Sequence, residues 1–97
     1  MLAPEGPLDI ASVTEVYKRM IELPLRPGGE LVVDLQGVTF MDSTGIRLLL
    51  QAREHARRCR ASLLLVRGPG EVMRVLELVG LDQQLAIVAP RERVAAG

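Results

Sequence analysis

The sequence has few aromatic residues, a single cysteine and no net charge, and each shortage excludes a class of function. Only Tyr17 and Phe40 are aromatic, 2% of the 97 residues, so a base-stacking surface for single-stranded nucleic acid is not expected. The 12 basic residues balance the 12 acidic ones, which removes any bulk attraction to nucleic acid or to an anionic membrane. Cys59 has no partner for an internal disulfide, which suits a reducing compartment.

Long apolar runs are also missing. No stretch approaches the roughly 18 residues needed to span a bilayer, and the chain does not begin with the basic and apolar segments of a signal peptide. We therefore expect a cytoplasmic protein without direct membrane insertion. His55 is the only histidine and has no second ligand at metal-binding spacing, so neither a metal nor a cofactor is expected.

The sequence does contain aliphatic residues in patterns typical of an α/β domain. Its length predicts a single domain over residues 1–97, with a loose tail at 91–97. Apolar residues at three- and four-residue spacing predict helices near Val13, Ile46 and Val72. Short apolar runs predict buried strands at 31–35, 62–66 and 86–88. This alternation predicts a mainly parallel sheet with right-handed crossovers.

The ends of the predicted helices have recognisable signals. Asp9 or Ser12 could cap the first helix, and Pro24 ends it. Gly80 is expected to close the third helix in a left-handed conformation.

The turn Met41-Asp42-Ser43-Thr44-Gly45 joins a strand to a helix, the place where sites gather in parallel sheets. The first turn of a helix has unpaired N–H groups, which Asp42 or Ser43 could cap. Gly45 would let a ligand or a partner's backbone approach. A phosphate on Ser43 or Thr44 would be favoured at these N–H groups and would add about two negative charges, so a partner that binds the unmodified turn would be repelled. A helix cap without further function is the alternative interpretation.

Charged residues outside the turn have simpler interpretations. Asp34 ends a buried strand and either positions the Ser43 loop or bonds to nearby backbone, and the second role is the expected one. A basic cluster is most simply a solvated face, although it could meet an acidic partner or a phosphate. Its members are Arg53, Arg57, Arg58 and Arg60.

The segment VVDLQGVTFMDSTG, residues 32–45, resembles the signature of the STAS domain, which is found in bacterial anti-sigma factor antagonists and sulfate transporters. In that family an apolar-apolar-Asp-Leu strand, a short linker with Phe and an Asp-Ser-(Ser/Thr)-Gly turn occur in this order. Gly6-Pro7-Leu8-Asp9 is similar to the family's Gly-x-Leu-Asp motif, and Leu78-Val79-Gly80-Leu81 is similar to the end of its third helix. The resemblance covers residues 2–90.

This resemblance implies an α/β, STAS-like fold with a four-stranded, mainly parallel sheet and three to four helices. STAS domains usually have two strands before the Gly-x-Leu-Asp motif, whereas five residues precede Gly6 here. We therefore expect the first family strand to be missing or truncated and the second to be a stub at Leu2-Ala3. If the domain is truncated in this way, an open sheet edge would invite pairing with a partner or formation of a homodimer.

The resemblance also implies a regulatory function. In the antagonists, the first hydroxyl residue after the Asp is phosphorylated by an anti-sigma factor that is also a serine kinase of the histidine-kinase-like ATPase type. Here that residue is Ser43, with Thr44 as the second choice. Phosphorylation ends binding to the kinase, and a phosphatase restores it. The residues expected to bind the partner are Asp42, Ser43, Thr44, Gly45 and Asp9.

The alternative function is a STAS subunit of an ABC-type lipid transporter or of a stress-signalling complex, in which the same turn docks without phosphorylation. Enzymatic activity is not expected, because Ser43 has no histidine or lysine nearby in sequence to act as a base. ATP would belong to the kinase and not to this chain.

Overall fold

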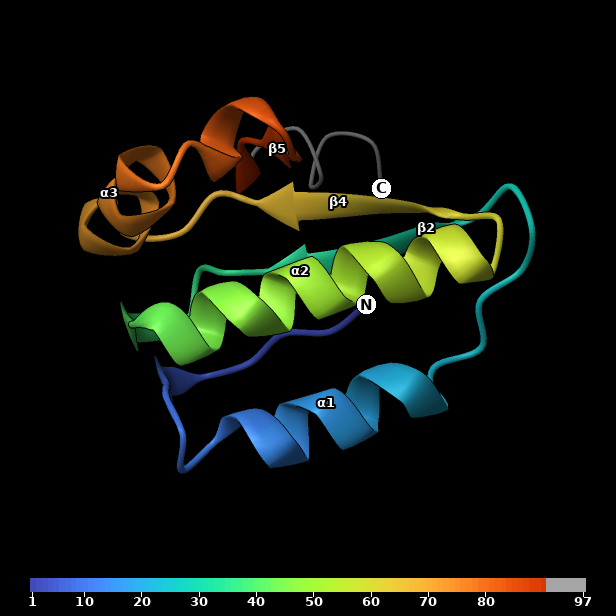
Figure 1. Cartoon of the computed structure of the whole chain (residues 1–97), viewed down its shortest axis with the longest axis horizontal. Helices are drawn as coiled ribbons and strands as arrows, with labels where there is room; N and C mark the ends of the chain where they lie inside the picture. Colours follow the sequence, from blue (N-terminus) through green and yellow to red (C-terminus); the bar gives the residue numbers. More distant parts are fainter. Residues whose placement is uncertain (91–97) are drawn as a thin grey trace.

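The computed structural model describes residues 1–90, and Figure 1 shows its helices packed against a parallel sheet. Strands and helices alternate along the chain, as the apolar pattern predicts. The order is β1 (Gly6–Leu8), α1 (Val13–Glu22), β2 (Glu30–Asp34), β3 (Val38–Met41), α2 (Ser43–Arg58), β4 (Ser62–Val66), α3 (Gly70–Leu78), the short 3₁₀ helix η1 (Leu81–Gln83) and β5 (Ala86–Val88).

Within residues 1–90 every strand pairing is parallel. Three strands form a sheet in the order β2-β4-β5, and β1 pairs with β3. A bridge between Leu2 and Val33 places the start of the chain beside β2, so the N-terminal segment runs along both β2 and β3. The predicted α/β fold with a mainly parallel arrangement of strands is thereby confirmed, with the strands assigned to a three-stranded and a two-stranded sheet.

The N-terminal segment is more ordered than the sequence indicated. The sequence indicated only a stub at Leu2-Ala3 in this region, but Gly6–Leu8 also form a strand, β1. The Leu2 N–H donates to the Val32 carbonyl at 2.8 Å, and the Leu2 carbonyl accepts from the Asp34 N–H at 2.8 Å. The segment is therefore an edge strand in two pieces, whose Pro4 and Pro7 lack the N–H needed for further pairing.

Strand β3 was also not predicted as a separate element. Val38–Met41 pair with β1 in the register Gly6↔Val38, Pro7↔Phe40 and Leu8↔Met41. Neither partner has a strong apolar alternation, so the pairing depends on tertiary packing more than on local pattern. The consequence is that β3 leads directly into the turn at Asp42.

A single aliphatic core joins the three α-helices to one face of the sheet. Its sheet residues alternate along the strands, which places every second side chain on the core face. They include Leu31, Val33, Leu63 and Leu65. The central helix α2 contributes residues at three- and four-residue spacing, namely Leu48, Leu49, Ala52 and Ala56. Among residues 1–90 no charged or polar side chain is buried, so the functional groups lie at the surface.

The helix ends largely follow the sequence signals. Helix α2 ends at Arg58 with Cys59 as its C-terminal cap, and Gly80 follows α3 in the predicted left-handed conformation, with φ of 78°. Ser12 occupies the N-cap position of α1 without capping it through its side chain. Among residues 1–90, none of the helices has the length and apolar character that crossing a bilayer requires. The tail predicted at 91–97 lies outside the described residues.

Candidate functional site

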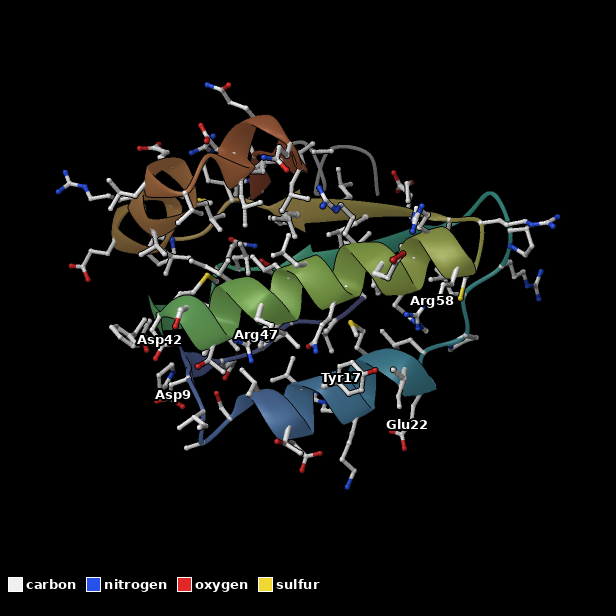
Figure 2. The ribbon with its side chains drawn as sticks, viewed as in Figure 1. Asp9, Tyr17, Glu22, Asp42, Arg47 and Arg58 are labelled. Carbon is white, nitrogen blue, oxygen red and sulfur yellow. The ribbon has the colours of Figure 1, made fainter. Side chains whose placement is uncertain are left out.

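Two loops meet at the carboxyl end of β1 and β3. Leu8 and Met41 are opposite each other in this parallel pair, and the next residues are Asp9 and Asp42. Figure 2 shows both aspartates at the same end of the molecule, beside the start of α2. The fold therefore brings together two candidate residues that are far apart in the sequence.

Asp42 is the cap of α2. One oxygen of its carboxylate, Oδ1, accepts hydrogen bonds from the N–H groups of Thr44 at 2.9 Å and Gly45 at 3.4 Å. Its carbonyl accepts the first helical hydrogen bond, from the Ile46 N–H at 3.0 Å. Of the two capping residues that the sequence left open, the structure uses Asp42 and not Ser43, a contribution of about 1 kcal/mol to stability.

Ser43 is consequently the first residue of α2, and its side chain is exposed. Its neighbours are less accessible, since Asp42 and Thr44 are half-buried and Gly45 is buried. We expected a phosphate on this turn to bind the free N–H groups of the helix. Two of those groups, the N–H groups of Thr44 and Gly45, already donate to Asp42, so a phosphate on Ser43 would have to compete with the Asp42 carboxylate for them.

Gly45 has a packing role that the sequence did not indicate. A β-carbon at this position would lie 2.9 Å from the Leu8 carbonyl oxygen and 2.6 Å from Cγ of Met41. The close approach that glycine allows in this structure is by this chain's own strands β1 and β3. Gly45 lets the first turn of α2 pack against the sheet, which fixes the position of Ser43.

The loop between β1 and α1 is held by its own side chains. Oδ1 of Asp9 accepts from the Ala11 N–H at 3.0 Å. The Ser12 hydroxyl accepts from the Asp9 N–H at 3.1 Å and donates to the Pro7 carbonyl at 2.6 Å. These bonds fix Asp9, which is half-buried, next to the Asp42 turn.

Asp34 bonds to its local backbone, as expected. Its two carboxylate oxygens accept from the backbone N–H and the side-chain amide of Gln36, at 2.9 and 3.0 Å. Its carboxylate is thus engaged within its own turn.

Two exposed apolar residues border the site and were missed by the sequence analysis. Ile10, in the loop after β1, is 83% exposed, and Phe40, in β3, is 52% exposed. Large apolar side chains exposed next to polar groups are typical of contact surfaces. The signal that could have found Phe40 is its position as the only phenylalanine, two residues before Asp42.

An open groove of about 260 Å³ separates α1 from α2 and starts at the candidate turn. Figure 2 shows Tyr17 of α1 and Arg47 of α2 between the two helices. Thr44 lines this groove, whereas the neighbouring Ser43 does not. The two adjacent hydroxyl residues of the turn therefore lie on different surfaces, Thr44 on the groove and Ser43 outside it.

Arginines dominate the outer surface of α2. Arg57 makes two hydrogen bonds to the Glu54 carboxylate, at 2.8 and 2.9 Å. This contact lowers the pKa of Glu54, with the charges of Arg57, Arg58 and Arg53 acting in the same direction, and it raises the pKa of Arg57. Arg53 reaches Oε1 of Gln84 at 3.4 Å. In the described part of the chain, no three His, Cys, Asp or Glu side chains gather as a metal site would require.

The fold and the site together define an α/β domain whose candidate site is a surface turn at the start of its central helix. The family model of the STAS domain matches residues 1–95, and the chain belongs to this family. STAS domains are generally binding or regulatory domains.

Two similar proteins support this assignment. A STAS-domain containing protein of Pseudomonas aeruginosa (strain UCBPP-PA14) is 32% identical over 73 residues, which is 75% of this chain and 68% of that protein. The STAS domain of a SulP transporter from Vibrio cholerae matches with a TM-score of 0.70 and 23% identity, over 97% of this chain and 76% of that one. At this identity the second likeness is one of fold.

Proposed function

We propose that this chain is an anti-sigma factor antagonist that binds an anti-sigma factor with serine kinase activity and is released when Ser43 is phosphorylated. The observation that carries the proposal is the position of Ser43. It is exposed at the first residue of α2, between the capping Asp42 and the buried Gly45. A kinase can reach this hydroxyl without unfolding the turn.

The phosphorylation step itself needs nothing from this chain except the hydroxyl. The γ-phosphoryl group of the kinase's ATP is transferred to Oγ of Ser43, the hydroxyl proton is lost, and ADP leaves. A phosphatase hydrolyses the ester and restores the serine. The product carries about two additional negative charges at this position.

The effect of this phosphate is expected to be local. Because Asp42 already accepts from Thr44 and Gly45, the phosphate does not replace a missing cap and has no reason to refold α2. It adds bulk and charge next to the Asp42 carboxylate instead. A kinase surface that fits the neutral turn would then face a repulsion of several kcal/mol, which is enough to end binding.

The residues around Ser43 supply the contacts that such a surface needs. Ile10, in the loop after β1, and Phe40, in β3, offer exposed apolar area. Asp9 and Asp42 offer carboxylates with fixed positions. Apolar anchors with a polar rim are the usual composition of a protein–protein interface.

The test is a comparison of Ser43 variants in binding to a serine kinase of the histidine-kinase-like ATPase type. Ser43→Ala should bind and should remain bound when ATP is added, while Ser43→Asp should not bind. Thr44→Val, the matched control at the neighbouring hydroxyl, should bind and should still be released by ATP. Equal binding by Ser43→Ala and Ser43→Asp would refute the proposal.

A second candidate function is a STAS subunit that serves a transporter. The likeness in fold to the STAS domain of a SulP transporter, with its TM-score of 0.70, is the observation that favours it. In this case the same turn would dock to the ATPase subunit of an ABC-type lipid transporter without phosphorylation. Binding to such a subunit that is unchanged by kinase and ATP, and equal for Ser43→Ala and the native chain, would support it.

A further inference from the structure

The charge of this protein is distributed unevenly, although its net charge is zero. Residues 43–60, which contain α2 and the turn after it, carry a net charge of +4 and the remaining residues carry −4. Glu54 is the one acidic residue of this stretch. Its five basic residues form what we call the arginine ridge, namely Arg47, Arg53, Arg57, Arg58 and Arg60.

The ridge faces outward along the whole of α2. Its five arginines are all exposed, because the apolar residues of α2 occupy the opposite face. Arg47 borders the groove toward α1 near its start, and Arg58 borders a hollow further along between the same helices. Arg53 and Arg57 border a separate hollow on the other side. Figure 2 shows Arg47 and Arg58 at well-separated points of the helix.

Most of this positive charge is not neutralised. Glu54 is engaged by Arg57, and within residues 1–90 no ion pair involves another arginine of the ridge. Arg53 has a side-chain partner, the uncharged Gln84. The ridge therefore presents several guanidinium groups that are available to carboxylates from outside.

Stabilisation of the helix does not explain the ridge fully. Arginines near the C-terminal end of a helix interact well with its dipole, which accounts for Arg57 and Arg58. Arg47 lies in the second turn of α2, far from the C-terminal end where the dipole would favour a cation. Arg53 and Arg57 are four residues apart, a spacing at which like charges repel. This arrangement is unfavourable within the isolated domain, so an external anionic group is the simpler explanation.

We propose that the arginine ridge is a docking surface for an acidic segment of a partner protein, which lies along α2 from the Ser43 end. Charge complementarity identifies the partner's chemistry, since a guanidinium group binds carboxylates with two parallel hydrogen bonds. The exposed parts of Tyr17 and Leu50, 38% and 36%, lie beside the arginines and add the apolar area that a protein interface contains.

A membrane surface fits these observations less well than a protein. A helix that binds in the bilayer interface inserts an apolar face among the lipids. The apolar face of α2 is buried in the protein core, including Leu48 and Ala52. Leu50 is the one large apolar side chain of α2 that is exposed, which is too little for insertion.

The ridge would also make binding sensitive to modification of Ser43, a part of the inference that rests on the proposed function. Arg47 follows Ser43 by four residues, which places both side chains on one side of the helix. A phosphate on Ser43 would attract Arg47 and would reduce the charge of residues 43–60 from +4 to about +2. An acidic partner would then bind more weakly.

The probe for a test is an acidic peptide of about 16 residues, long enough as a helix to follow α2. It would consist of Glu, Asp, Leu and Ala, and a second peptide would have Lys in place of the acids. Fluorescence anisotropy would measure binding to the full chain, and NMR of the ¹⁵N-labelled chain would locate it. The acidic peptide should bind and the basic one should not. The largest shifts should be at Arg47, Arg53 and Arg58, and affinity should fall with added salt.

Charge-reversal variants of α2 and of α1 distinguish binding at the arginine ridge from an effect of the protein's overall charge. The variant Arg47→Glu/Arg53→Glu should lose about tenfold or more in affinity. Its matched control is Lys18→Glu/Arg19→Glu, which reverses two exposed charges on α1 and should change affinity far less. Arg47→Gln/Arg53→Gln, which adds no acid to α2, should give an intermediate loss, and thermal melts would verify that each variant is folded.

Equal losses in the two charge-reversal variants would overturn the proposal. So would tighter binding to vesicles containing anionic lipid than to the acidic peptide. Ser43→Asp should weaken peptide binding, and unchanged binding would overturn the link to Ser43. Because these measurements need no kinase, they remain informative even if the antagonist function fails its own test.

Discussion

Leu8 and Met41 lie opposite each other in the parallel pair of β1 and β3, and each is followed directly by an aspartate of the candidate site. This relationship explains why a surface turn can have a defined shape. Gly45 packs against both residues, so the two strands and the first turn of α2 form one tight junction.

Replacing Gly45 with alanine should disturb this junction. A β-carbon there would lie 2.9 Å from the Leu8 carbonyl oxygen, so the backbone has to move and stability should fall by about 1–3 kcal/mol. Urea denaturation would measure the change. Gly70→Ala is the matched control, because a β-carbon at Gly70 meets no atom within 4 Å and should leave stability nearly unchanged. Similar midpoints for both variants would contradict the packing described for Gly45.

Removing the Asp42 cap should also destabilise the protein. Asp42→Ala leaves the Thr44 and Gly45 N–H groups without their acceptor, at a cost of about 1 kcal/mol, whereas Asp42→Asn should retain most of the stability. Ser43→Ala should have little effect, since the Ser43 side chain does not cap α2. Thermal unfolding would rank the three variants, and a larger loss for Ser43→Ala than for Asp42→Ala would reverse the assignment of the cap.

The exposed apolar residues should matter for binding and not for folding. Phe40→Ala is expected to weaken partner binding by about 2 kcal/mol, because aromatic anchors dominate protein interfaces, while the melting temperature should change little. Ile10→Ala should act in the same direction. Ile21→Ala, in α1, is the control, since Ile21 is 47% exposed and Phe40 is 52% exposed. Calorimetric titration with the partner would detect the difference, and an equal effect of the control would argue against a contact at Phe40.

The pKa of Glu54 should reveal its interaction with the arginine ridge. The hydrogen bond from Arg57 lowers the pKa of Glu54 below its ordinary value of 4.5. A lowered pKa in the folded state means that ionised Glu54 favours folding above pH 4.5, and this contribution is lost on acidification through the lowered pKa. Carbon-detected NMR should show the titration midpoint of Glu54 rising in Arg57→Gln. An unchanged midpoint would mean that the contact does not persist in solution.

Much of the fold could be predicted because its main elements have strong apolar periodicity. Helices α1, α2 and α3 and strands β2, β4 and β5 lie where the spacing of Leu, Val and Ile indicates. Strands β1 and β3 could not be predicted in the same way. They are short, β1 has Pro7 at its centre, and they become strands by pairing with each other across the fold.

The candidate site, like the fold, could be predicted only in part. Its location at a strand–helix turn follows from the sequence, but the roles of its residues do not. Asp42 and Ser43 are both good caps, so only the structure shows that Asp42 is used and Ser43 remains exposed. Likewise, the sequence marks Gly45 as special without indicating that Leu8 is the neighbour that requires it.

The contact between Gly45 and Leu8 has a consequence for how Ser43 can be recognised. Ser43 is presented by a helix start that depends on β1, a strand more than thirty residues earlier in the chain. A short peptide with the sequence of residues 38–48 contains the serine but not that support, and a helix of this length does not persist alone in water. An enzyme that modifies Ser43 as displayed here would have to read a three-dimensional epitope, and it would ignore the unfolded chain or a proteolytic fragment of it.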